Sequence, residues 1–229
     1  MDVVYTMIPP IWQTNDWRKS QNEVAQNYTT ALRSSDVKYV VNLSSIGAHL
    51  KNGVGPVGGV HDLEQLLNTL TGISVKHLRP SYFYFNLLAQ IGLIKQAGIM
   101  GGNFGDQEKV FLVHPKDIAA AALEELLKLD FKGSSVRYII GDERSGEEIS
   151  SVLGKAIGKN LNWVTFTDDQ QKTGLLQAGL SETHAGGYTE MGHALRDGSM
   201  QRHARESKPT FSSVKLEDFA TEFAKAFSA

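Results

Sequence analysis

The chain has 229 residues, of which 41% are hydrophobic and 21% are charged, and this composition argues against a disordered protein. Lys and Arg number 23 and Asp and Glu number 25, so the formal net charge is −2, and we expect no nucleic-acid partner and no membrane partner. The absence of cysteine excludes disulfide frameworks, thiolate metal sites and cysteine nucleophiles. The sequence shows neither a secretory signal nor an apolar run as long as a membrane helix, so we expect a cytoplasmic protein.

Short apolar strands alternate with longer helical patterns in the first half of the chain. The run 3–8 predicts a strand, which Pro9 and Pro10 end. Residues 37–43 predict a second strand, apolar at nearly every position as expected where both faces of a sheet are covered. A third strand is predicted over 73–78. Between these strands, helical spacing predicts two helices, with buried faces made of Val24, Tyr28, Ala31 and Leu32, and of Leu63, Leu66, Leu67 and Leu70.

The second half of the chain continues the alternation. Residues 110–113 predict a strand. Pro115 predicts the start of a helix, because the first helical position donates no intrahelical hydrogen bond, and Asp117 suits the positive end of the helix dipole. The remaining predicted elements are a strand over 136–140, a helix over 149–157 and a mainly helical tail from Asn162.

Repeated strand–helix–strand units predict an α/β fold with a parallel sheet and helices on both faces. Ligands in such folds bind beyond the carboxyl ends of the strands. We therefore expect the functional loops to follow Met7, Leu43, Leu78 and Val113.

Residues 53–58 match the dinucleotide-binding pattern G-x-G-x-x-G. That pattern should directly follow a strand and open a helix, with an acidic residue about 20 positions later for the ribose. Here roughly ten residues separate the strand from the glycines, Pro56 lacks a backbone N–H, and residues 73–80 contain no acid. The segment is interpreted as a flexible loop.

Two hydroxyl side chains, Ser44 and Ser45, follow the predicted strand 37–43 at its carboxyl end. They could hydrogen-bond a substrate carbonyl or a cofactor amide, or they could cap the turn, and the residues alone leave both open. His61 and Gln65 lie on the side of the next helix that faces away from the leucines. That side faces either solvent or a cleft, and a surface position is the more common one for a single histidine.

An aromatic segment follows the third predicted strand. Pro80 and Ser81 stand at the strand exit, where the edge of a ligand would lie, whereas Phe83 and Phe85 are interpreted as packing residues. Residues 101–105 are rich in glycine and predict a mobile loop. No histidines have a metal-ligand spacing, so we predict no metal site. The basic residues between 196 and 208 are interpreted as a solvated surface.

Taken together, these motifs resemble the NmrA-like family of atypical short-chain dehydrogenases. The resemblance rests on the order and spacing of residues 3–10, 43–47, His61 with Glu64, 78–86, 114–119, 149–159, 177–180 and 188–191. Members of the family have a Rossmann-like fold and bind NAD or NADP. The resemblance implies a Rossmann-like part over 1–144 and a small, mainly helical substrate lobe over 145–229 that packs on it.

The implied function is an NAD(P)H-dependent oxidoreductase that reduces a small molecule of carbonyl or quinone type. The resemblance implies that the catalytic residues are His61, Ser44 and Ser45. The cofactor would be bordered by Thr6, Met7, Ile8, Pro9, Ser44, Ser45, Pro80 and Ser81. The substrate would lie near Tyr82, Asn86, Gly101, Gly102, Asn103 and Phe104.

Two departures from the family pattern affect this interpretation. The family normally begins with a strand, a Gly-rich turn and a helix, so we expect an N-terminally truncated sheet whose exposed edge at 3–7 favours a homodimer or another protein partner. The usual Tyr-x-x-x-Lys pair corresponds to His61 and Gln65, and glutamine cannot lower the pKa of a neighbouring acid, although histidine is an acid near neutral pH. The alternatives are a non-catalytic redox sensor that acts through a partner, and a form that cannot bind the dinucleotide.

Overall fold

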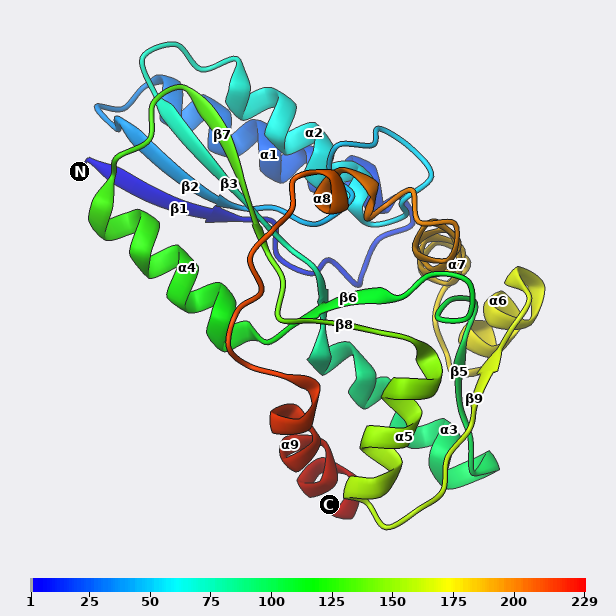
Figure 1. Cartoon of the computed structure of the whole chain (residues 1–229). Coiled ribbons are helices and arrows are strands. Elements are labelled where there is room, and N and C mark those ends of the chain that lie inside the picture. The colour runs from blue at the N-terminus through cyan, green and yellow to red at the C-terminus, as the bar shows by residue number, and fades with distance from the viewer. Residues whose placement is uncertain (1) are drawn as a thin grey trace.

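The computed structural model describes residues 2–229 and contains a main sheet of four parallel strands. Helices cover both faces of this sheet, as Figure 1 shows, so the predicted α/β class is confirmed. The strands in spatial order are β1 (Val3–Met7), β2 (Tyr39–Leu43), β3 (Ser74–Pro80) and β7 (Ser134–Ile139). The covering helices are α1 (Trp17–Arg33) and α2 (Val57–Asn68) on one face and α4 (Pro115–Lys128) on the other.

The two faces of the sheet follow from the alternation of side chains along each strand. Val40 of β2 and Val75 of β3 pack with the leucines of α2 and with α1. Val41 and Leu78, on the opposite face, pack with α4, including Ile118. Because both faces are covered, nearly every position of β2 is apolar, as the sequence indicated.

Helix α1 buries a face that overlaps the predicted one in part, because Leu32 is buried and Tyr28 packs against the core. Ala31 is exposed and Val24 is half-buried, whereas two polar residues, Gln21 and Thr29, are buried. Gln21 donates to the Pro56 carbonyl, and the Thr29 hydroxyl donates to carbonyls of its own helix. The apolar spacing misplaced part of the face because the Thr29 hydroxyl and the Gln21 amide N–H find backbone acceptors there, although the Gln21 side-chain oxygen has no partner within residues 2–229.

A second, smaller sheet contains the strand predicted over 110–113. This strand, β6 (Val110–Val113), pairs in parallel with β4 (Tyr82–Phe83) and antiparallel with β8 (Asp142–Arg144). The expectation that the turn after Val113 shares the edge of the main sheet is therefore wrong. The run of apolar residues was sufficient to predict this strand, because both of its faces are buried. It carries no information on which other strands it pairs with. Pro115 begins α4 as predicted, and the His114 side chain accepts the Lys116 N–H at its start.

The segment predicted as a mobile loop over 101–105 is buried, and its first part is a strand. β5 (Met100–Gly102) pairs in parallel with β9 (Trp163–Thr165). A Cβ at Gly101 would lie 2.5 Å from the Val164 carbonyl oxygen, so the glycine permits close approach of two backbones and does not mark a turn. The prediction of a mobile loop was wrong because glycine occurs both in turns and where two backbones approach closely.

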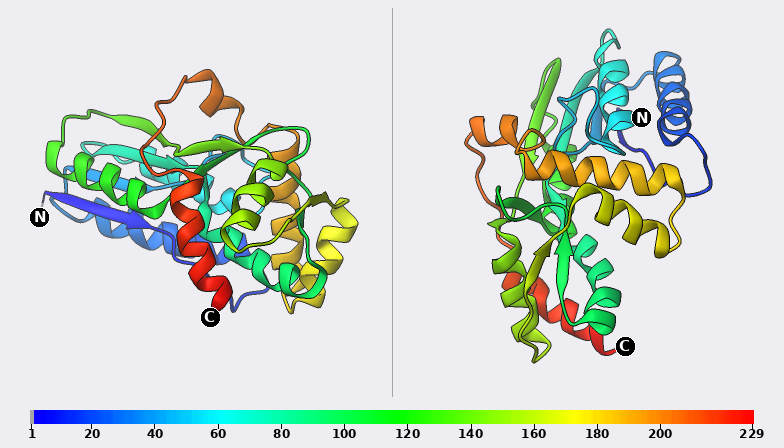
Figure 2. Two further views of the ribbon diagram at one scale, coloured as in Figure 1. Left: turned by 60° about the horizontal axis from the view of Figure 1, so that its bottom comes forward. Right: turned by 90° about the vertical axis from the view of Figure 1, so that its right-hand side faces the viewer.

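The remaining elements surround β5 and β9. Figure 2 shows that α7 runs between the main sheet and this part of the chain. These elements are η1 (Tyr84–Ala89), α3 (Gln90–Ala97), α5 (Gly146–Ala156), α6 (Asp168–Gln177), α7 (Glu182–Arg196), α8 (Arg202–Glu206) and α9 (Leu216–Ser228). One apolar cluster joins residues on both sides of position 144, for example Leu112 and Phe219. The division into 1–144 and 145–229 stays a prediction.

Strand β1 forms one edge of the main sheet within residues 2–229. Tyr5 and Met7 point to the face that α4 covers farther along the sheet, and each is 41% exposed. Association through this edge stays a prediction. Across residues 2–229, no helix combines the length and the apolar character that a membrane crossing requires.

Candidate functional site at the carboxyl ends of the main sheet

A row of polar side chains crosses the main sheet near its carboxyl ends. Thr6, Asn42 and His77 occupy matching positions on β1, β2 and β3. The Thr6 hydroxyl donates to Asn42 Oδ1 over 3.0 Å, and Asn42 Nδ2 donates to His77 Nδ1 over 3.1 Å. His77 Nε2 then donates to Asn68 Oδ1 over 2.9 Å. Burial lowers the pKa of His77, so this histidine is a neutral member of the row.

Thr6, which the sequence predicted to border the cofactor, is hydrogen-bonded within this row to Asn42. Thr6 is only 3% exposed, and its hydroxyl proton is used by Asn42. Met7, Ile8 and Pro9 continue from β1 into the loop before α1, and Met7 offers its carbonyl to the Tyr28 hydroxyl over 2.8 Å. Their contact with a cofactor stays a prediction.

A buried ion pair lies just beyond this row. Arg79 at the end of β3 contacts Glu64 of α2 through Nε over 2.9 Å and through Nη2 over 2.5 Å. Burial alone would lower the pKa of Arg79, but its hydrogen bonds to Glu64 and the charge of that carboxylate leave the pKa raised. Ser44 at the end of β2 also donates its hydroxyl to Glu64. The predicted catalytic residue Ser44 is therefore held by a carboxylate, and its oxygen can act only as an acceptor toward a ligand.

The other two predicted catalytic residues lie in and beside the segment after β2. The Ser45 hydroxyl donates to the Ile46 carbonyl over 3.0 Å. His61 of α2 is half-buried, and its Nδ1 lies 2.8 Å from the Ala48 carbonyl oxygen. Since a carbonyl only accepts, Nδ1 carries the proton and Nε2 is the atom that can accept one. Gln65, one turn later, is exposed.

Ser81 carries a buried hydroxyl for which residues 2–229 provide no hydrogen-bond partner. The residue follows β3, is 3% exposed, and is fixed through its backbone N–H to the Ile139 carbonyl. An unsatisfied buried hydroxyl costs about 1–3 kcal/mol, so such a group calls for an explanation. A ligand group at the carboxyl ends of the strands would supply the missing partner.

The predicted substrate residues separate into two groups. Tyr82 packs against Phe104 with ring centroids 5.6 Å apart, and burial together with the nearby Tyr188 raises its pKa. Asn103, by contrast, uses its amide to bind Asp168 of α6 and the Thr189 carbonyl of α7. Gly101 and Gly102 are buried in β5, and Asn86 is exposed on η1. Tyr82 and Phe104 are thus the pair of side chains that the structure brings together.

An aromatic cluster that the sequence did not indicate connects the loop after β1 to α7. Its members are Trp12, Trp17, His184 and Tyr188. His184 Nε2 donates to the Ile11 carbonyl over 3.2 Å, so α7 holds the loop at the carboxyl end of β1. The spacing of four between His184 and Tyr188 places both on one face of a helix, but their partners are about 170 residues earlier in the chain.

The glycine segment 53–58 is packed and does not form a free cradle. The Gly55 N–H donates to Glu190 Oε2 over 2.8 Å, and a Cβ at Gly55 would lie 2.0 Å from the Gly187 carbonyl oxygen. Gly55 therefore permits close contact with α7, whereas a Cβ at Gly53 would have no atom within 4 Å. Residues 53–56 form a loop as predicted, but residues 57 and 58 already belong to α2, and the expectation of flexibility missed the contact of Gly55 with α7.

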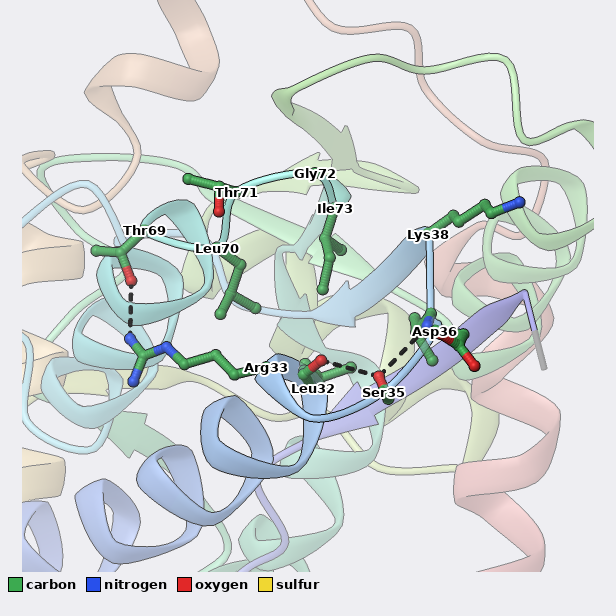
Figure 3. Close-up of a pocket in the computed structure, with 11 residues that line it drawn as sticks. Leu32, Arg33, Ser35, Asp36, Lys38, Thr69, Leu70, Thr71, Gly72 and Ile73 are labelled. Atoms are coloured by element: carbon green, nitrogen blue, oxygen red, sulfur yellow. Dashed lines mark hydrogen bonds between the residues drawn. The ribbon is translucent and has the colours of Figure 1, made fainter.

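Two cavities adjoin the helices on the α1–α2 face. One, of about 300 Å³, lies between the start of α1, the loop 51–55 and α7. The other, of about 430 Å³ and shown in Figure 3, lies where α1 and α2 end and β2 and β3 begin. The second cavity is at the opposite end of the strands from Ser44 and Ser81. No group of three or more His, Asp or Glu side chains within residues 2–229 is arranged to hold a metal ion.

Comparison with known proteins places this fold among NAD(P)-binding reductases and epimerases. The chain is 26% identical over 200 residues to an NAD(P)H azoreductase of Xenophilus azovorans, covering 87% of this chain and 68% of that protein. An NADPH-dependent quinone oxidoreductase of Escherichia coli superposes with a TM-score of 0.74 at 18% identity, over 96% of this chain and 76% of the other.

Two further solved structures have the same fold. A triphenylmethane reductase of Citrobacter sp., complexed with NADP(H), gives a TM-score of 0.71 at 18% identity, over 97% of this chain and 76% of the other. A nucleoside-diphosphate-sugar epimerase of Staphylococcus aureus gives 0.76 at 14% identity, over 96% and 76%. No family model matches the chain, so the specific resemblance to the NmrA-like family stays a prediction.

Proposed function

We propose that this chain is an NAD(P)H-dependent oxidoreductase that reduces a small molecule of quinone or carbonyl type. The observation that carries the proposal is the unsatisfied hydroxyl of Ser81 beside the polar carboxyl ends of β2 and β3. This is the edge where parallel α/β sheets bind ligands. The similarity to an NAD(P)H azoreductase and to quinone and triphenylmethane reductases supports the reaction class and favours a conjugated acceptor.

The described residues fit the nicotinamide half of such a cofactor. Bound NAD(P)H supplies a hydride, and the acceptor takes this hydride and one proton to give the reduced product and NAD(P)⁺. In the proposed arrangement Ser81 would donate its hydroxyl to the carboxamide oxygen, and Pro80 and the loop from Met7 to Pro9 would hold the nicotinamide. The arginine–carboxylate pair behind Ser44 keeps the floor of the site rigid.

His61 is the group proposed to deliver the proton. Its Nδ1–H is used by the Ala48 carbonyl, which fixes the ring and leaves Nε2 to hold and release a proton. This assignment requires no tyrosine–lysine pair. It also requires that the acceptor approach the first half of α2.

The described residues do not fit a pyrophosphate in the same way. The first turn of α1 is capped by the Asp16 carboxylate, which accepts the Lys19 N–H over 3.0 Å. The loop before α2 gives its Gly55 N–H to Glu190. Both carboxylates would repel a phosphate group. We therefore assign no pyrophosphate contact to these residues.

Calorimetric titration of the chain with NADPH and with NADH tests the proposal, followed by a panel of quinones and aldehydes. We expect binding of at least one cofactor and its oxidation by at least one acceptor. Ser81→Ala should weaken cofactor binding about fivefold, because one hydrogen bond is lost, while raising the free energy of unfolding of the free protein by about 1 kcal/mol, because the unsatisfied hydroxyl is removed. Ser35→Ala is the matched control, because its hydroxyl already donates to the Leu32 carbonyl over 2.8 Å and lies at the opposite end of the strands.

Three outcomes would contradict parts of this proposal. Absence of binding by both dinucleotides would favour the form that cannot bind the cofactor. Binding without oxidation by any acceptor would favour the redox sensor. Equal effects of Ser81→Ala and Ser35→Ala on cofactor binding would remove the role given to Ser81.

A further inference from the structure

Trp12 presents a large aromatic surface to solvent beside the proposed site. Its side chain is 59% exposed, although its indole ring lies 5.4 Å from the His184 ring at an interplanar angle of 24°. The ring is also nearly parallel to Tyr188, at 27° and 6.5 Å. Trp17 lies behind them, 4.4 Å from His184. The indole is therefore held in a defined orientation with much of its surface free.

The exposed indole is not needed to fasten the loop that carries it. His184 already binds the Ile11 carbonyl over 3.2 Å, and the Thr183 hydroxyl binds the Asn15 carbonyl over 3.0 Å. These two contacts flank Trp12 and attach the loop to α7. A small side chain at position 12 would leave both contacts in place, so anchoring does not account for a tryptophan there.

A path of direct contacts leads from Trp12 toward the carboxyl ends of the strands. Tyr188 lies almost parallel to Trp12, and the carbonyl of the next residue, Thr189, accepts the Asn103 amide N–H over 2.8 Å beside Phe104. Tyr82 directly follows Ser81 and packs on Phe104. The path thus begins beside the unsatisfied Ser81 hydroxyl and ends at the exposed indole.

We propose that Trp12 and Tyr188 form an aryl-binding surface for a planar small molecule with at least two aromatic rings. One ring would lie near Ser81 and Tyr82, and the outer ring would stack on Trp12. Stacked aromatic pairs are favourable beyond the area that they bury, and a ring already held in position loses little freedom on binding. The identification of this ligand as the reduced substrate rests on the proposed function, whereas its binding does not.

Equilibrium binding of methyl red, a diaryl azo compound, to the full chain without cofactor tests the surface directly. Trp12→Ala should raise the dissociation constant about tenfold, and Trp12→Phe about threefold, because the smaller ring keeps part of the stack. The matched control is Leu127→Ala on α4, a side chain that is 75% exposed and far from the path in sequence and on the opposite face of the sheet. This control should leave the dissociation constant within about twofold.

The result that would overturn the proposal is an unchanged dissociation constant in both Trp12 variants, or no binding of methyl red by the unmodified chain. A melting temperature measured for each variant separates unfolding from loss of contact, and Trp12→Phe decides the matter if Trp12→Ala does not fold.

Turnover separates this proposal from the proposed function. With NADPH, Trp12→Ala should raise KM for methyl red about tenfold and change KM for the single-ring acceptor 1,4-benzoquinone by less than about twofold. If neither acceptor is reduced but methyl red binding still depends on Trp12, the proposed function fails and the aryl surface stands. If methyl red and 1,4-benzoquinone are both reduced and Trp12→Ala changes neither KM, the proposal of an aryl-binding surface is wrong and the proposed function stands.

Discussion

Replacing Glu64 by glutamine should destabilise the protein strongly, because Arg79 would keep its charge in a site with little access to water. Glu64 is 1% exposed and Arg79 is 6% exposed, and the two share two hydrogen bonds of 2.9 and 2.5 Å. Breaking a buried pair by removing one charge costs about 3–5 kcal/mol. Glutamine retains one acceptor oxygen, so we expect a loss of about 3 kcal/mol. That is a large part of the 5–15 kcal/mol by which a typical domain is stable.

Urea unfolding followed by circular dichroism measures this loss, and a control is available on the same helix. Asp62 is the neighbouring acid on α2 and pairs with Arg18 over 2.7 Å, but the two side chains are 22% and 37% exposed. Because solvent screens that pair, Asp62→Asn should cost only about 1 kcal/mol.

A double variant tests the reasoning behind the prediction. Glu64→Gln combined with Arg79→Met should lose less stability than the sum of the two single variants, because it removes the unpaired charge. The reasoning is refuted if Glu64→Gln and Asp62→Asn cost the same, or if the two single losses simply add. Either result would mean that water reaches Arg79 and satisfies it when Glu64 is neutral.

Two further predictions concern pH and close packing. Burial, followed by the charge of Arg79, lowers the pKa of His77, so folding favours its neutral form; the stability from this group is present above the unfolded pKa of about 6.5 and is lost as pH falls from there toward the folded pKa. Urea unfolding at pH 7.5 and 5.5 should therefore show a larger loss for the unmodified protein than for His77→Gln, and equal losses would contradict the assignment. Gly53→Ala and Gly55→Ala both place a side chain at positive φ, +78° and +52°, but only the second would bring its Cβ to 2.0 Å from a backbone oxygen. Thermal melting should give losses of about 1 kcal/mol for Gly53→Ala and about 3 kcal/mol for Gly55→Ala, and similar values would show that the loop moves away from α7 at little cost.

Patterns of apolar residues were sufficient for the parallel sheet and its covering helices. Strand 37–43 is apolar on both faces because α2 and α4 cover it, and that is a local property which the sequence carries. The partner of a strand is not local. β6 is apolar and buried at every position, whereas β7 contains two serines and an arginine, yet β7 and not β6 joins the main sheet. Pairing is decided by contacts between segments far apart in the chain.

The candidate site was predictable to the same extent. Ser44 and Ser81 could be found because each follows a strand at the edge where ligands bind. The hydrogen-bond partners that limit what these two hydroxyls can do could not be predicted from the sequence. The bond from Ser44 to Glu64, and the lack of a partner for Ser81, depend on how a helix and a neighbouring strand pack. The cluster around Trp12 depends on α7, which lies about 170 residues away in sequence.

The polar row across β1, β2 and β3 also restricts which substitutions this chain can accept one at a time. Each member has a single role, since Thr6 donates to Asn42, Asn42 donates to His77, and His77 donates to Asn68. Changing Thr6 to valine would leave the buried Asn42 oxygen unsatisfied, and changing His77 to leucine would leave the buried Asn42 amide N–H without a partner, whereas Asn68 is exposed to water. An apolar row of the same shape could be equally stable, but every single step toward it passes through a protein with an unsatisfied buried group. We therefore expect these positions to change together between related chains, as a linked set and not as independent sites.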